Sequence, residues 1–177
     1  CRSRCWWISC CSCPIGLARM ADKLLSEMLK LSAFEYHLIP LTNWRARVII
    51  LIGGTHEQHI DAFKRNKLPK SEQDNMADYI RDQMRTTAGV TLQSSYRPRR
   101  QFIYFAKRPD VSHGEVANVV AHELLHATIH ILKHANMRLN EGSEEAYTYL
   151  LGYLIEQFWL KVPPQKVYRP NVNSPAK

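Results

Sequence analysis

The segment AHELLHATIHILKH, residues 121–134, contains four histidines spaced four residues apart and a single glutamate. Residues four apart on an α-helix lie on one face, one turn above the other. His122 and His126 can therefore direct both imidazoles at one point, which suits two of the four tetrahedral positions around zinc. Glu123 lies beside the pair, where a carboxylate can hold a metal-bound water and accept its proton. The pattern predicts two zinc ligands and a general base.

The other two histidines of the segment are not expected to reach the same metal ion. With a rise of about 1.5 Å per residue, His130 and His134 lie about 6 Å and 12 Å along the helix from His126. We expect His130 to line the neighbouring cleft or to bond a carboxylate. We expect His134 to be solvated near the helix C-terminus, where the helix dipole tolerates positive charge.

The third ligand must then come from another part of the chain, and three glutamates follow at a suitable distance: Glu141, Glu144 and Glu145. An antiparallel partner helix can return such a carboxylate to the metal. Each of the three remains a candidate ligand.

The spacing HExxH, eighteen residues, then Glu145 resembles the gluzincin class of zinc metallopeptidases. The chain is also similar to small HExxH proteins of phage and bacterial genomes, in which a glutamate opens a helix of the form ExxxYLxxYL. Residues 101–160 carry the similarity. It implies zinc held by His122, His126 and Glu145. Gluzincins often place an acid four residues after the ligand to orient a zinc histidine, so the resemblance also allows Glu141 as ligand with Glu145 as the orienting acid. It also makes Tyr149 a candidate catalytic residue, because a phenol can stabilise the oxyanion of a tetrahedral intermediate. The plainer alternative is an aromatic core stripe formed by Tyr149 and Tyr153.

Two other metalloprotease patterns fit less well. Metzincins require HExxHxxGxxH, but Ile129 and Leu132 occupy the glycine and third-histidine positions. The letters HELLHA are similar to DNA-repair metalloproteases of the SprT type. Those proteins have a third histidine instead of the glutamate and usually a cysteine zinc ribbon, whereas no cysteine follows Cys13.

A second histidine pair, in THEQH, places His56 and His59 around Glu57. Its spacing of three aligns two ligands less well than a spacing of four, and no carboxylate cluster follows it. We therefore expect these side chains to be surface residues.

An α+β fold must position the site: a small twisted sheet with packed helices, in which the active-site helix packs against the glutamate-bearing helix. Strands are expected at residues 36–41, 45–52, 89–95 and 101–107. Helices are expected at residues 20–33, 56–66, from a Ser71 cap onward, at about 113–135 and at about 143–161.

Finer features of these elements can also be predicted. Strand 45–52 is apolar enough to be central, and strands 89–95 and 101–107 flank an Arg/Pro loop that suits a hairpin. By resemblance to zincins, residues 101–107 would be the edge strand that an extended peptide joins. Ser112 and Glu115 form a capping box for the active-site helix. The helix after Ser71 is expected to bury four side chains: Met76, Tyr79, Ile80 and Met84.

The 177 residues suggest a leader at 1–19, one domain at 20–162 and a disordered tail at 163–177. All five cysteines lie in the leader, which we interpret as upstream or artificial sequence ahead of a natural start at Met20. A cysteine-free body fits a cytoplasmic protein. No apolar run approaches eighteen residues, so no membrane span is expected.

The charge of the chain is mildly basic. Its formal value of +8 includes three arginines of the leader, which has no acid. This balance does not demand a nucleic-acid partner. The densest basic run, residues 96–100, is interpreted as a solvated loop.

The function predicted from these patterns is zinc-dependent hydrolysis of a peptide or protein substrate. Two alternatives remain: a zinc-binding structural or interaction protein that does not hydrolyse, and a nucleic-acid-associated protease. The pattern leaves the oligomeric state open.

Overall fold

The computed structural model describes residues 33–83, 87–107 and 112–162, and the structural statements below concern these residues. Within them, four helices and a four-stranded mixed sheet form an α+β fold. The strands are β1 (Glu35–Leu41), β2 (Ala46–Ile52), β3 (Gly89–Gln93) and β4 (Arg100–Phe105). Their order is β1-β2-β4-β3, with β2 and β4 parallel and the two outer pairs antiparallel.

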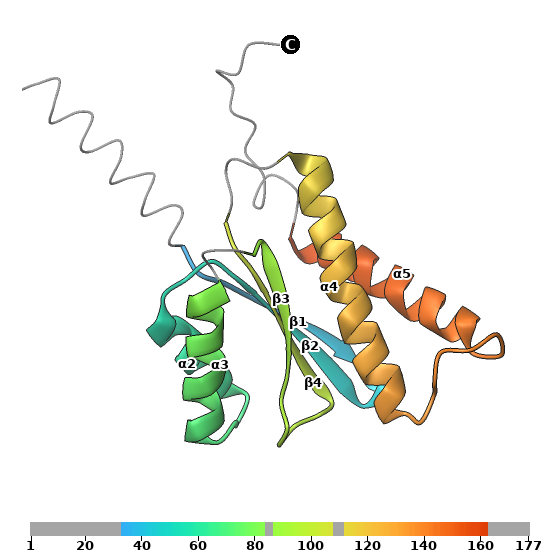
Figure 1. Ribbon diagram of the computed structural model, residues 1–177, viewed down its shortest axis with the longest axis horizontal. Helices are drawn as coiled ribbons and strands as arrows, with labels where there is room; N and C mark the ends of the chain where they lie inside the picture. Colours follow the sequence, from blue (N-terminus) through green and yellow to red (C-terminus); the bar gives the residue numbers. More distant parts are fainter. Residues whose placement is uncertain (1–32, 84–86, 108–111, 163–177) are drawn as a thin grey trace, which may run out of the picture. The chain divides into compact units, whose positions relative to one another are not determined.

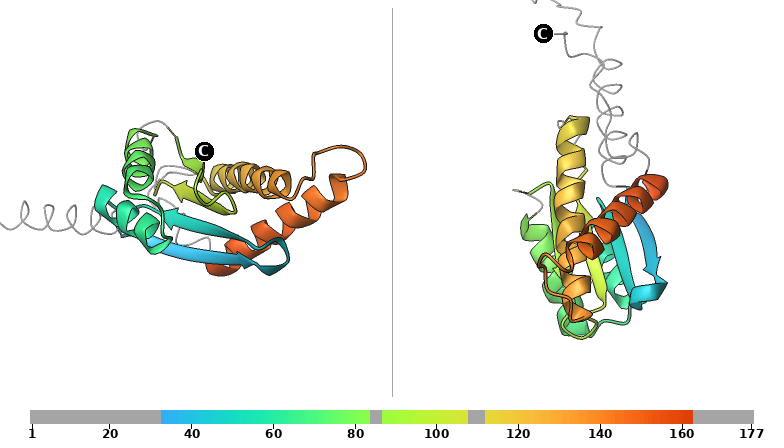
Figure 2. Two further views of the ribbon diagram at one scale, coloured as in Figure 1. Left: turned by 90° about the horizontal axis from the view of Figure 1, so that it is seen from below. Right: turned by 90° about the vertical axis from the view of Figure 1, so that its right-hand side faces the viewer.

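Helices cover both faces of the sheet (Figures 1 and 2). One layer contains α2 (His56–Arg65) and α3 (Lys70–Gln83), and the other contains α4 (His113–His134) and α5 (Glu144–Lys161). Strand β2 contributes to both cores, since Ile50 packs toward α4 and α5 whereas Ile49 and Leu51 pack toward α2 and α3. A strand that is buried on both faces needs a continuous apolar run. The predicted central position of this strand is therefore confirmed.

The sheet order corrects one prediction. Strand β4 lies between β2 and β3, so it is an interior strand and not the edge strand expected from residues 101–107. Its burial agrees, because Phe102, Ile103 and Tyr104 are almost fully buried. Within the described residues, the edge strand on this side of the sheet is β3. The antiparallel hairpin of β3 and β4 is confirmed.

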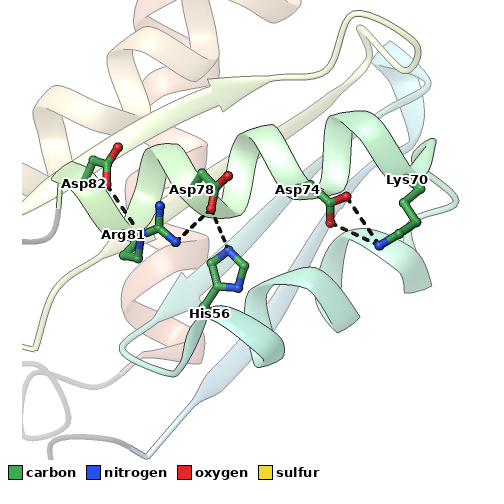
Figure 3. Close-up of polar contacts among 6 residues, drawn as sticks. All are labelled: His56, Lys70, Asp74, Asp78, Arg81 and Asp82. Atoms are coloured by element: carbon green, nitrogen blue, oxygen red, sulfur yellow. Dashed lines mark hydrogen bonds and ion pairs between the residues drawn. The ribbon is translucent and has the colours of Figure 1, made fainter.

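Helices α2 and α3 are joined by a polar network at their surface (Figure 3). His56 Nε2 lies 3.0 Å from Asp78 Oδ1, and Arg81 contacts the same carboxylate at 3.0 Å. Such exposed ion pairs contribute only about 0–1 kcal/mol each. Helix α3 begins at Lys70, so the prediction of Ser71 as its cap is wrong.

The burial expected for α3 is correct only in part. Met76 and Ile80 are buried, but Tyr79 is 46% exposed. Met84 lies outside the described residues. So do residues 1–32, which include nearly all of the helix expected at 20–33, and the tail at 163–177.

Helix α4 begins where the capping box predicts. Ser112 Oγ accepts from the Glu115 amide at 3.2 Å, and the Glu115 carboxylate accepts from the Ser112 amide at 2.6 Å. These bonds satisfy two of the amides that the first turn leaves without a helical partner. Of the helices described, none is both long and apolar enough to cross a bilayer.

Candidate metal centre

His122 and His126 lie one turn apart on α4, and both side chains are exposed. Their Nε2 atoms are 3.1 Å apart, and the ring centroids are separated by 4.7 Å at an interplanar angle of 82°. Both nitrogens therefore point at one small region of solvent beside the helix. This convergence is what the spacing of four predicts, and it provides two imidazole donors of the kind that zinc binds.

Glu123 is held against the sheet beside this pair. Its side chain is only 7% exposed, and Oε2 accepts a hydrogen bond of 2.7 Å from Thr91 Oγ1 on β3. The same hydroxyl lies 2.9 Å from the Glu123 carbonyl oxygen. Gly89 makes the close approach possible, because a Cβ there would lie 2.9 Å from a Val119 methyl and 3.0 Å from Glu123 Cγ.

Sequence reasoning missed Thr91 and Gly89. The threonine lies 32 positions before Glu123 and acts only through the packing of β3 against α4. No spacing rule connects a strand residue to a helix residue at that separation. A glycine at the start of a strand could have suggested a close approach, since glycine in a strand often marks one.

His130 and His134 of α4 contact residues of the sheet. His130 Nδ1 lies 3.0 Å from Gln101 Oε1, so its partner is an amide and not the carboxylate that we expected. Burial lowers the pKa of His130, and the neighbouring His126, Lys133 and His134 lower it further. His134 is exposed near the end of the helix, as predicted, and accepts from Gln93 Nε2 at 2.6 Å.

The three glutamates considered as third ligands are all exposed: Glu141, Glu144 and Glu145. Within the described ranges, no three His, Cys, Asp or Glu side chains are grouped closely enough to hold a metal ion. The structure thus brings the two histidines together, and Glu145 is not grouped with them.

Tyr149 lines a pocket that includes neither His122 nor His126. It is 76% exposed and lines a pocket of about 310 Å³ together with Tyr153 and the turn between β1 and β2. That turn contains the 3-10 helix η1 (Thr42–Trp44). The alternative of a core stripe is wrong for both tyrosines, because Tyr153 is 42% exposed as well. The buried residues of α5 are four others: Tyr147, Leu150, Leu154 and Phe158.

The surface position expected for both histidines of THEQH is wrong for His59. His59 is fully buried, and its Nε2 donates to the Gly53 carbonyl at 2.8 Å. Its ring makes edge-to-face contacts with the rings of Phe34 and Tyr104, at centroid distances of 5.9 Å and 5.3 Å. Burial is the main cause that lowers the pKa of His59. This histidine is a component of the core.

His122 and His126 therefore provide two donors that suit zinc, since their exposed Nε2 atoms converge and the Glu123 carboxylate lies beside them.

Comparisons of the chain with models of protein families, with curated proteins and with solved structures found no match.

Proposed function

We propose that the protein is a zinc-dependent peptidase that hydrolyses peptide bonds through a metal-activated water, with Glu123 as general base. The observation that carries the proposal is the convergence of the His122 and His126 Nε2 atoms, 3.1 Å apart, beside a buried and anchored carboxylate. Glu145 is the proposed third ligand, with Glu141 and Glu144 as alternatives. Zinc in such a site lowers the pKa of its water and polarises a carbonyl.

The role of Glu123 follows from how its carboxylate is held. Thr91 bonds Oε2, so the other oxygen, Oε1, can accept a proton from the attacking water. A proton taken in this way can be passed to the departing amine of the cleaved peptide. The bond to Thr91 restricts the rotamers of Glu123, and that restriction keeps the base in position before the substrate binds.

The proposed substrate is an extended peptide that pairs with β3. This assignment replaces residues 101–107, because β4 is already paired on both sides. The strand also carries Thr91, so a peptide along the edge of β3 that no described strand covers would lie close to Glu123. Pairing through main-chain hydrogen bonds binds extended peptides with little dependence on their side chains.

The test measures zinc content and peptide hydrolysis of the purified protein and of Glu123→Gln. We expect both proteins to bind zinc. We expect the rate of hydrolysis to fall by about 10²–10⁴-fold in the variant, the usual contribution of a general base. Exposed Glu156→Gln on α5 is a matched control that should retain the rate.

Two other outcomes would contradict the proposal in different ways. Zinc in both proteins without hydrolysis by either would remove the peptidase and leave a zinc-binding structural or interaction protein. Failure of the unmodified protein to bind zinc would remove the metal centre itself.

A further inference from the structure

A second hollow, of about 390 Å³, lies at the end of the sheet where β2 and β4 begin. It is lined by five arginines, one tyrosine and one proline, and no acidic side chain takes part: Arg45, Arg47, Tyr96, Arg97, Pro98, Arg99 and Arg100. We call this hollow the arginine pocket. It shares no residue with the histidine pair on α4.

Parallel pairing of β2 and β4 creates the arginine pocket. Because the two strands run in the same direction, their first residues are neighbours, and Arg47 pairs with Arg100 in the register. The Arg47 amide donates to the Arg99 carbonyl at 2.9 Å. Arg45 precedes β2 in a left-handed conformation with φ of 48°. Cations from two distant segments are thereby concentrated at one end of the sheet.

The positive charges of the pocket are not balanced within the described part of the chain. No ion pair there involves any of its arginines. Arg100 is half-buried and donates to the Asn66 carbonyl. Burial lowers the pKa of Arg100, and the nearby charges of Arg97 and Arg47 lower it further. Like charges held together in this way repel, and a bound anion would relieve the repulsion.

Glu72 contacts the loop before these arginines, but its carboxylate accepts hydrogen bonds from two serines. Glu72 of α3 accepts from Ser94 Oγ at 2.8 Å, from the Ser95 amide at 2.7 Å and from Ser95 Oγ at 3.0 Å. Both carboxylate oxygens therefore anchor the loop backbone and its serines. The guanidinium groups of Arg97 and Arg99, which follow directly, are left exposed to solvent.

The loop that carries these arginines is also held in one shape. Ser94 Oγ accepts from the Arg97 amide at 2.8 Å, and the Arg97 carbonyl accepts from the Arg100 amide at 2.7 Å. Gln101 Nε2 donates to the Pro98 carbonyl at 2.8 Å. A loop that is already ordered loses less conformational entropy when a ligand binds, so its charges can be used for binding.

We propose that the arginine pocket binds single-stranded nucleic acid, with its guanidinium groups on phosphates and Tyr96 stacked on a base. Arginine suits phosphate because its planar fork can donate two parallel hydrogen bonds. The Tyr96 ring is 62% exposed at the rim of the pocket, where a base freed from a duplex can stack on it. Five cations exceed the charge of one phosphate monoester, which is about −2, whereas a strand supplies a further charge with each nucleotide.

This inference differs from the solvated loop expected for residues 96–100. That expectation considered one basic run, which does not include Arg45, just before β2, and Arg47 in β2. The binding proposed here does not depend on the peptidase function, because neither zinc nor Glu123 takes part in it.

The test titrates the full chain into a labelled single strand of about 16 nucleotides and follows fluorescence anisotropy at several salt concentrations. We expect Arg97→Gln combined with Arg99→Gln to weaken binding by at least about tenfold. We also expect the slope of log affinity against log salt to shrink by about 0.7 for each phosphate that the variant no longer neutralises. Tyr96→Leu should weaken binding by about tenfold, with the salt slope unchanged.

The matched control removes two exposed cations of α2, through Lys64→Gln combined with Arg65→Gln. An equal loss of affinity in this control would overturn the proposal, because net charge alone would then explain binding. Equal affinity for a duplex, or displacement of the strand by inorganic triphosphate at the same phosphate concentration, would also overturn it. Equal affinity for a duplex would indicate a duplex-binding surface, and displacement by triphosphate would indicate a site for a small phosphorylated ligand.

Discussion

Helices α2 and α4 each carry a His-Glu pair followed by another histidine, yet the two segments have different surroundings. In α4 the spacing is four, and the Nε2 atoms of His122 and His126 are exposed and 3.1 Å apart. In α2 the spacing is three, and the two side chains diverge. His56 bonds Asp78 of the neighbouring helix at 3.0 Å, whereas His59 bonds Gly53 inside the core.

One residue of spacing accounts for the difference. Four residues turn an α-helix by about 40° beyond one full turn, whereas three residues fall about 60° short of it. The shorter spacing rotates His59 into the face of α2 that contacts the sheet. The comparison shows that the similar sequences HExxH and HExH give two converging imidazoles only when the helix presents both side chains to the same region of solvent.

The largest expected effect concerns zinc affinity. Replacing His126 by Ala removes a proposed zinc ligand, and loss of a group that merely supports a ligand already costs about 10–100-fold. We therefore expect zinc affinity to fall by at least about 100-fold in His126→Ala, measured by competition with a chelating dye. His56→Ala on α2 is the control. Zinc lost to the same extent in both variants would remove the distinction between the two helices.

The next prediction compares the same two helices by their effect on stability, and here the larger change is expected from α2. His59→Ala leaves a cavity between Phe34 and Tyr104 and removes the donor to the Gly53 carbonyl. We expect its free energy of unfolding to fall by about 2 kcal/mol in urea titrations. His122→Ala is exposed and should change stability by about 0.5 kcal/mol or less. Similar stabilities of the two variants would contradict the core assignment of His59.

A smaller effect tests the anchoring of Glu123. Thr91→Val keeps the shape of the side chain and removes the donor to Oε2. If Glu123 is the base of the proposed peptidase, we expect kcat to fall by about tenfold with KM and zinc content unchanged. Thr42→Val in the exposed η1 turn is the control. A change in KM alone would assign Thr91 to substrate binding.

The smallest effect is a pH dependence of stability to which the buried His59 of α2 contributes, beside the half-buried His130 of α4. The pKa of His59 is lowered chiefly by burial and also by His56, while the Gly53 carbonyl and Glu57 act in the opposite direction. Below the ordinary value of 6.5, the unfolded chain binds a proton that the folded chain does not. Stability should therefore fall as the pH decreases through this value. His59→Gln should flatten that part of the profile, whereas His56→Gln should preserve it.

Much of the secondary structure could be predicted because its signals are local. The capping box of Ser112 and Glu115 lies within three residues, and it places the start of α4 correctly. The apolar run of β2 identifies a central strand without knowledge of its neighbours. The convergence of His122 and His126 is equally local, since one turn of helix determines it.

The neighbours of each element could not be predicted in this way. The resemblance to zincins predicts an edge strand at β4, but β2 pairs with it in parallel across about fifty residues of chain. The free energy of such a pairing depends on both partners and on the helices between them, so neither segment reveals it alone. The bond from Thr91 to Glu123 depends on the same arrangement, because it joins a strand to a helix.

The sequence by itself determined the helical register that pairs two histidines and places a glutamate beside them. Only the tertiary structure decided that β3 anchors this glutamate, that His59 is buried and that five arginines line one pocket. The physical reason is the range of the interactions. Helical hydrogen bonds and capping link residues up to four apart. Packing and strand pairing join segments that are distant in the chain, and the choice of partner depends on the fold as a whole.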